Sequence, residues 1–195
     1  MVKARERTQD MEPPRATADE RQLIVRSQRG DKTAYGELVK QYRLLLLSIS
    51  YRLSGDPELA EDATQEAFLR AWQHLPGFEL KQPGGFRAWL CRIVTNVTID
   101  ELRRQRPRVP LEALDLPDGT QPDSEYIRRE RAEVVQAAIA TLPERSRAAL
   151  VLREYGQLSY QEIADALNIP IGTVMSRLNY ARRQLRTLLE PYLVP

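Results

Sequence analysis

The stretch LSYQEIADALNIPIGTVMSRL, residues 158–178, constrains the fold of this chain more than any other segment. Ser159 followed by Glu162 is the S-x-x-E capping box with which a helix begins. Asn168 suits the strained turn after that helix, and Pro170 suits the first turn of the next helix, where its missing N–H costs nothing. The stretch therefore predicts two short helices joined by a tight turn, the form of a DNA-reading helix-turn-helix.

The second of these helices, predicted over residues 170–189, combines an apolar stripe with a basic face. The stripe is expected to face the core, and its members recur every three or four residues: Ile171, Val174, Leu178, Ala181, Leu185 and Leu188. The opposite face carries four arginines and no acidic residue. Such a helix can enter a major groove, where Ser, Asn and Arg hydrogen-bond to base edges and Arg binds phosphates. The alternative is an amphipathic surface helix whose basic face is only solvated.

Helical periodicity extends over most of the remaining chain, so we expect an all-α protein. Apolar residues recur at helical spacing from about residue 19 to 106, with breaks at Arg29-Gly30-Asp31 and at Ser54-Gly55-Asp56-Pro57. Beyond a short first helix around Leu23, the predicted helices span about 32–52, 57–75, 86–106, 125–141, 144–154, 160–167 and 170–189.

Residues 107–124 separate the two helical parts and differ from both in composition. The segment holds four prolines, and between Leu111 and Tyr126 there are five acidic residues and no basic one. This composition is typical of an extended acidic linker. The sequence therefore predicts two small helical domains, with these boundaries: a flexible tail 1–18, a helical domain 19–106, the linker 107–124 and a second helical domain 125–195.

The composition argues against a disulfide-stabilised protein, a Cys-rich zinc protein and an enzyme, and it leaves a nucleic-acid partner open. A net charge of +2 neither requires nor excludes a nucleic-acid partner. The single cysteine, Cys91, cannot form an internal disulfide or a Cys-rich zinc site, and we expect it to pack in the core. The single histidine, His74, has no evident catalytic partner, so neither an enzyme nor a metal or cofactor site is predicted.

The sequence also bears on the cellular location of the protein. The charged N-terminus lacks the apolar region of a signal peptide, and the most apolar short run, LLLLSIS at 44–50, is far shorter than a membrane span. We expect a cytoplasmic protein with no membrane insertion.

A second informative stretch, ELAEDATQEAFLRAWQHL at 58–75, predicts a helix whose outward face carries Asp62, Gln65, Glu66 and Leu69. Asp62 and Glu66 are one turn apart and both negative, which costs a few tenths of a kcal/mol in an isolated helix. A partner surface could offset that cost. A merely solvated acidic face is the alternative, and the residues alone leave it open.

A third stretch, FRAWLCRIVTNVTIDELRRQR at 86–106, suits a nucleic-acid strand. Its cationic residues could bind the backbone, and a nearby aromatic loop containing Phe78 could receive an unstacked base. The residues left for faces other than the core are Arg87, Arg92, Asn96, Asp100, Arg103 and Arg104. The alternative is a structural helix that ends in a basic turn, which the helix dipole favours.

With these three stretches in this order, the chain resembles a bacterial RNA polymerase sigma factor of the extracytoplasmic-function type over about residues 20–190. DATQEAFLRAW is similar to the family's core-polymerase-binding helix. WLCRIVTNVTIDELRR is similar to the helix that engages the −10 element, and LSYQEIADALNIPIGTVMSRLNYARRQL to the −35-reading helix-turn-helix.

The resemblance implies an initiation factor that directs core polymerase to −35 and −10 elements and assists promoter opening. Contacts to the polymerase, with its β′ clamp helices and β subunit, would come from Asp62, Gln65, Glu66 and Leu69. Contacts to the non-template single strand at −10 would come from Phe78, Arg87, Arg92, Asn96, Asp100, Arg103 and Arg104. Contacts to duplex DNA at −35 would come from Thr173, Met175, Ser176, Arg177, Asn179, Tyr180 and Arg183. The resemblance also implies an anti-sigma factor as a partner.

One residue of the predicted −35 surface departs from the family's usual pattern. Many members of the family have Lys or Arg where this chain has Met175, whose thioether cannot donate a hydrogen bond, so another member's −35 sequence does not transfer.

The competing hypothesis is a helix-turn-helix repressor or activator that binds duplex DNA without polymerase. Such proteins usually bind as dimers, and the chain shows no heptad dimerisation helix after the motif and no sensor domain before it.

Overall fold

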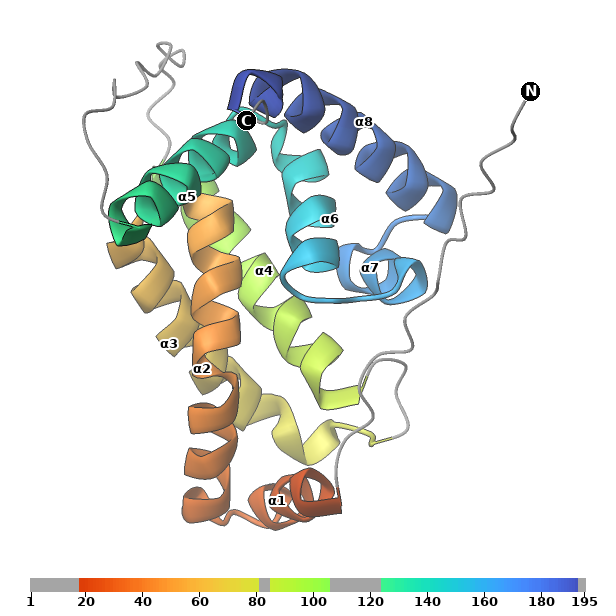
Figure 1. Cartoon of the computed structure of the whole chain (residues 1–195). Coiled ribbons are helices and arrows are strands. Elements are labelled where there is room, and N and C mark those ends of the chain that lie inside the picture. The colour runs from red at the N-terminus through yellow and green to blue at the C-terminus, as the bar shows by residue number, and fades with distance from the viewer. Residues whose placement is uncertain (1–17, 81–84, 106–123, 193–195) are drawn as a thin grey trace.

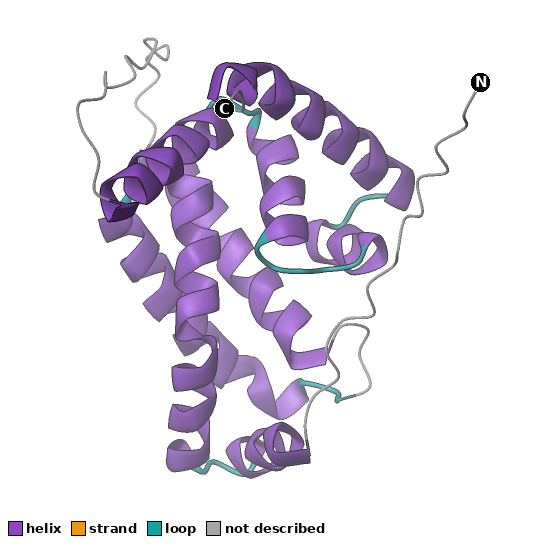
Figure 2. Ribbon diagram, in the orientation of Figure 1, coloured by secondary structure: helices purple, strands orange, loops and turns teal. Residues whose placement is uncertain are grey.

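The computed structural model describes residues 18–80, 85–105 and 124–192, and within these ranges every regular element is a helix (Figure 2). The all-α prediction is therefore confirmed. The predicted tail, except residue 18, and the predicted acidic linker, except residue 124, lie outside the described residues.

The helices fall into two groups along the chain (Figure 1). The N-terminal half consists of α1 (Ala18–Gln28), α2 (Lys32–Ser54), α3 (Pro57–His74), the 3-10 turn η1 (Leu75–Gly77) and α4 (Gly85–Gln105). The C-terminal half consists of α5 (Ser124–Ala140), α6 (Glu144–Glu154), α7 (Tyr160–Leu167), α8 (Ile171–Leu189) and the 3-10 turn η2 (Glu190–Tyr192). These bounds agree with the predicted ones to within one or two residues.

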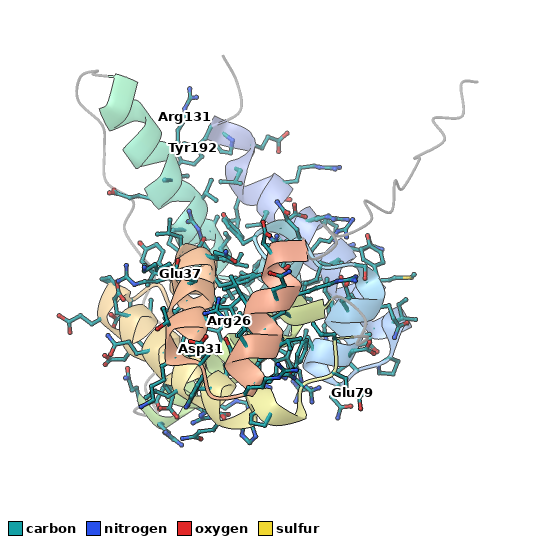
Figure 3. The ribbon with its side chains drawn as sticks, turned by 90° about the horizontal axis from the view of Figure 1, so that it is seen from below. Arg26, Asp31, Glu37, Glu79, Arg131 and Tyr192 are labelled. Atoms are coloured by element: carbon teal, nitrogen blue, oxygen red, sulfur yellow. The ribbon has the colours of Figure 1, made fainter. Side chains whose placement is uncertain are left out.

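Short capping motifs determine where the N-terminal helices begin. The Asp31 carboxylate accepts hydrogen bonds from the backbone N–H groups of Thr33 and Ala34 and begins α2. Arg26 of α1 donates to the other oxygen of the same carboxylate at 2.9 and 2.6 Å, and Figure 3 shows the two side chains together. Asp56 caps α3 in the same way, directly before Pro57. Each cap satisfies N–H groups that have no partner inside the helix.

The predicted capping box of the helix-turn-helix is present. The Glu162 backbone N–H donates to the Ser159 hydroxyl at 3.3 Å, and the Ser159 N–H donates to the Glu162 carboxylate at 2.7 Å. Asn168 ends α7 in the left-handed conformation with φ 51°. α8 then begins directly after Pro170. The local chemistry of this stretch thus determines where α7 begins and ends and where α8 begins.

The two halves pack against each other and share one hydrophobic core. In the N-terminal half α2, α3 and α4 contact one another, and α1 closes against α2; in the C-terminal half α8 packs on α5, α6 and α7. α2 contacts α5 and α6 across the junction, and α4 contacts α7. Buried side chains run continuously through both halves. Burial of this apolar surface is the main force that holds the two halves together.

Polar contacts from sequence-distant residues accompany this burial at the junction. Arg147 of α6 donates to the Leu53 carbonyl at the end of α2 at 2.7 Å. Arg52 donates to the Gln136 side chain at 2.9 Å, and its guanidinium lies 5.0 Å from the centre of the Tyr155 ring. The Arg147 contact satisfies a carbonyl at the C-terminal end of α2, where cations are favoured by the helix dipole.

Candidate functional site

The outward face of α3 carries the residues that the sequence assigns to a protein partner. Asp62, Gln65 and Leu69 are exposed and Glu66 is half-buried, while the opposite face of α3 is buried in the core. Leu69 is 60% exposed and lies among these acidic and amide side chains. Glu66 pairs with Arg70 at 2.7 Å. This pair, which the sequence reasoning did not include, offsets the repulsion predicted between Asp62 and Glu66.

On α4, Arg92, Asn96 and Asp100 are exposed and lie one turn apart along a single face. The opposite face is buried and includes Cys91, whose pKa burial raises to about 12. Cys91 is therefore a packing residue, as expected. The polar face of α4 forms a continuous strip along which an extended strand could lie.

Three of the predicted −10 residues are engaged by other groups of the chain, one within α4 and two in the C-terminal half. Arg104 pairs with Glu101 within α4 at 2.6 Å. Arg103 pairs with Glu144 at the start of α6 at 2.9 Å. Arg87 donates from Nε to the Gly156 carbonyl in the loop after α6 at 3.0 Å. The last two contacts connect this surface to the C-terminal half, which sequence reasoning did not predict.

Phe78 requires a correction. Its ring is only 4% exposed and packs edge-on against Phe86 at 5.5 Å and tilted against Trp89 at 4.9 Å. Its carbonyl accepts a hydrogen bond from Gln28 at 2.7 Å. A ring buried in this way offers no face for an unstacked base. Phe78 instead anchors one end of the segment before α4, of which residues 81–84 lie outside the described part of the chain.

α8 lies at the outer edge of the C-terminal half (Figure 1), and most residues of its predicted DNA-reading face are exposed. Thr173 and Arg177 are half-buried, and the remaining members of the set are exposed: Met175, Ser176, Asn179, Tyr180 and Arg183. The surface is therefore reachable along most of its length. It lies next to the turn that holds α8 at its angle to α7.

The apolar stripe of α8 is shorter than predicted. Val174, Leu178 and Ala181 are buried, but Ile171 is 40% and Leu188 41% exposed. The prediction of a core-facing stripe over the whole helix was wrong at both ends, whereas Leu185 is partly buried against the core.

Arg182 lies next to this face and was not predicted to have a structural role. It reaches Glu154 at 3.2 Å and the Tyr160 hydroxyl at 3.4 Å. These contacts hold α8 to the end of α6 and the start of α7. Its guanidinium is thus engaged in positioning the helix.

The described residues also bear on two other kinds of site. They contain no cluster of three or more His, Cys, Asp or Glu side chains that could hold a metal ion. Among the same residues, no helix is both long and apolar enough to cross a membrane.

Comparisons with known proteins match both halves. The family model for Sigma-70 region 2 matches residues 38–108, and that for Sigma-70 region 4 matches residues 132–185. The ECF RNA polymerase sigma factor SigW of Bacillus subtilis is 34% identical over 86% of this chain and 95% of its own length. The chain belongs to the ECF family of RNA polymerase sigma factors. This sigma factor is also 36% identical to the RNA polymerase sigma-H factor of Pseudomonas aeruginosa, over 89% of this chain and 95% of that protein.

A solved structure agrees with the fold of the sigma factor across both halves. The structure of CnrH in complex with the cytosolic domain of CnrY has a TM-score of 0.68 and 27% identity, and the match covers 89% of this chain and 98% of that chain. Region 2 corresponds to α2–α4, and region 4 to most of α5 through α8. The repressor alternative is not favoured, because it does not account for region 2.

Proposed function

We propose that this sigma factor binds core RNA polymerase through the exposed face of α3 and carries it to promoters through α4 and α8. The observation that carries the proposal is the outward face of α3, where Leu69 is 60% exposed between acidic and amide side chains. Because folding leaves this apolar side chain in water, a partner that covers it would gain the hydrophobic free energy of its burial. Asp62, Gln65, Glu66 and Leu69 would contact the β′ clamp helices.

The −10 strand would lie along α4. Arg92 and Arg104 would neutralise phosphates, while Asn96 and Asp100 would hydrogen-bond to bases turned out of the stack. Arg87 and Arg103 would join this surface once their contacts with the C-terminal half open. Phe78 would support the packing of Phe86 and Trp89 at the start of α4 rather than stack on a base.

The −35 duplex would receive α8 in its major groove. Ser176 and Asn179 have donors and acceptors for base edges, and Arg177 and Arg183 suit guanine or phosphate. Thr173, Met175 and Tyr180 would add apolar and hydroxyl contacts. Because Met175 donates no hydrogen bond, its base step is expected to be read by contact with a methyl group rather than by hydrogen bonding.

Each of the two helical domains would carry its own binding functions. We place the polymerase and −10 functions in 19–106, the −35 function in 125–195, and an acidic linker between them at 107–124. The linked domains would bind one promoter together, which raises the effective concentration of each. The polymerase supplies the chemistry, and the sigma factor, itself not an enzyme, would act with it in the cytoplasm.

An anti-sigma factor is the expected regulator. The matched CnrH structure is a complex with the cytosolic domain of CnrY, and the present chain shares its fold over both halves. A partner that covers the outward face of α3 would prevent polymerase binding.

Run-off transcription with purified core polymerase over a genomic promoter library tests the proposal. Promoter-specific transcripts are expected only when both polymerase and the sigma factor are present. The sequences upstream of their start sites would identify the −35 and −10 elements together. Tight duplex binding by the protein alone, with no co-elution with core polymerase, would instead support the repressor hypothesis.

A further inference from the structure

A cavity of about 670 Å³ lies at the junction between the two halves. Its walls come from α3 and α4 on one side and from α6, α8 and the α7–α8 turn on the other. Six of the lining residues are charged: Arg70, Asp100, Arg103, Glu144, Arg145 and Arg177. The volume falls within the range of about 300–1,000 Å³ that is usual for small-molecule sites.

The charges of this cavity are not balanced. Arg103 pairs with Glu144 at 2.9 Å, and Arg70 pairs with Glu66 at 2.7 Å. Arg145 and Arg177 have no carboxylate within ion-pair distance among the described residues. Two arginines from different helices thus line one cavity without an ion-pair partner in the described part of the chain, and the four arginines of its wall outnumber its two carboxylates, Asp100 and Glu144.

The two unpaired arginines interact with each other unfavourably. Burial lowers the pKa of the Arg177 guanidinium, and the nearby positive charge of Arg145 lowers it further. Like charges beside a partly desolvated cavity raise the free energy of the empty site. An anion placed between them would remove this repulsion and gain charge-assisted hydrogen bonds from two planar guanidinium groups.

The apolar part of the lining narrows the class of ligand. Ile99 of α4 and Ile169 of the α7–α8 turn contribute to the walls beside the arginines. A ligand that combines a phosphate group with a ring would meet both kinds of surface. A free inorganic ion would meet only the charged part.

We propose that this cavity binds a nucleotide-sized ligand through its phosphate groups, and that the bound ligand holds the two halves together. The ligand would bridge Arg145 and Arg177 of the C-terminal half to Arg70 and Arg103 of the N-terminal half. Because it binds only the packed arrangement, it stabilises that arrangement by mass action. The further consequence, which rests on the proposed function, is that the ligand keeps Arg103 and Arg177 from promoter DNA.

Calorimetry on the isolated full chain tests the site without polymerase or promoter, so its outcome is independent of the proposed function. The probes are ATP, pyrophosphate and adenosine, each at matched ionic strength. We expect ATP to bind and to raise the thermal midpoint, pyrophosphate to bind at least tenfold more weakly, and adenosine to show no binding. Heat or a midpoint shift that potassium chloride reproduces at equal ionic strength would overturn the proposal.

Variants locate the binding. Arg145→Ala removes an exposed arginine of the cavity that has no role in the proposed promoter contacts, and it should weaken ATP at least tenfold. Arg145→Lys should give an intermediate value, because it keeps the charge but loses the planar fork. Arg131→Ala, an exposed arginine on α5 that does not line the cavity, is the matched control and should leave ATP binding unchanged. Equal ATP binding by Arg145→Ala and the unaltered chain would refute the site.

Discussion

At the residue scale, exposure separates side chains that the sequence pattern treats alike. Leu69 and Phe68 are neighbours on α3, yet Leu69 is 60% and Phe68 only 8% exposed. An exposed leucine contributes little to the stability of the folded chain, because folding does not bury it. The Leu69 side chain would contribute hydrophobic free energy only when a partner covers it.

Substitution of Leu69 by arginine should therefore separate binding from folding. We expect Leu69→Arg to lower the affinity for core polymerase at least tenfold, about 1.4 kcal/mol, because a charge replaces the apolar centre of the interface. Competition binding with purified core measures this, and the thermal midpoint should stay the same. Leu44→Arg on α2 is the control, since Leu44 is 74% exposed and lies outside the proposed contact set. Equal losses for both variants would contradict a specific role for Leu69.

Phe78, unlike Leu69, is buried, so its substitution should affect folding. Phe78→Ala should lower the free energy of unfolding by about 3–5 kcal/mol, because it leaves a cavity among Phe86 and Trp89. Asn96→Ala, which alters an exposed side chain of α4, should change stability by less than about 0.5 kcal/mol while weakening −10 strand binding. Urea unfolding of both variants makes the comparison. A Phe78→Ala protein as stable as the parent would show that the ring does not support the core.

At the element scale, caps decide where helices begin and thereby how the proposed DNA-reading helix is held. α7 has only eight residues, so its two reciprocal capping hydrogen bonds are a large part of what defines it. The rest comes from the burial of its core-facing side chains, among them Ile163, which is fully buried.

Loss of the capping box should weaken α7. Ser159→Ala should cost about 1 kcal/mol in urea unfolding and lower −35 duplex affinity, since α8 is positioned through α7. Ser176→Ala on the exposed face of α8 is the matched control for stability and should change it by only a few tenths of a kcal/mol. If both substitutions cost the same, the box is not what stabilises the motif.

The cap of α2 should respond to acid. Hydrogen bonds from the Ala34 backbone and the Arg26 side chain lower the pKa of Asp31 below its usual value of 3.8. The carboxylate form is therefore favoured by folding. Its contribution is present above the unfolded-state pKa and is lost as the pH falls through the lowered folded-state pKa.

Asp31→Asn is the matched variant, because asparagine also caps helices but does not titrate. Urea unfolding between pH 7 and pH 3 should show a smaller loss of stability for Asp31→Asn than for the parent. Equal acid sensitivity in the two proteins would show that Asp31 does not contribute to it.

At the scale of the whole molecule, the two halves share contacts that use residues proposed for promoter binding. Arg103 contacts Glu144, and Arg87 contacts the Gly156 carbonyl. Promoter binding and packing of the halves would therefore compete for the same guanidinium groups.

Removal of one partner should shift that competition. Glu144→Gln should raise the affinity of the free protein for a −10 non-template oligonucleotide by up to about fivefold, because Arg103 loses its ion pair, which is worth about 0.2–1 kcal/mol. Fluorescence anisotropy at fixed salt measures the affinity. Glu154→Gln is the control, since Glu154 pairs with Arg182 inside the C-terminal half. A gain for both variants would indicate a general effect of charge rather than release of Arg103.

The sequence by itself determined the helices, their order and the family. Ser159 and Glu162, Asn168 and the turn at Gly55 act on neighbouring backbone groups, so their effects can be read from a few residues. The face of each helix also followed from local periodicity, as the exposed Asp62 and Asn96 show. Even there, local reasoning failed at Ile171 and Leu188, where the stripe continues beyond the helices that cover it.

Only the tertiary structure decided which of these surfaces meet. Arg103 and Glu144 are 41 residues apart in the chain, and Arg87 and Gly156 are 69 apart. The burial of Phe78 and the unpaired Arg145 and Arg177 around one cavity likewise arise from helices brought together at the junction. Such contacts depend on crossing angles and burial summed over the whole core, and no local pattern of residue types specifies them.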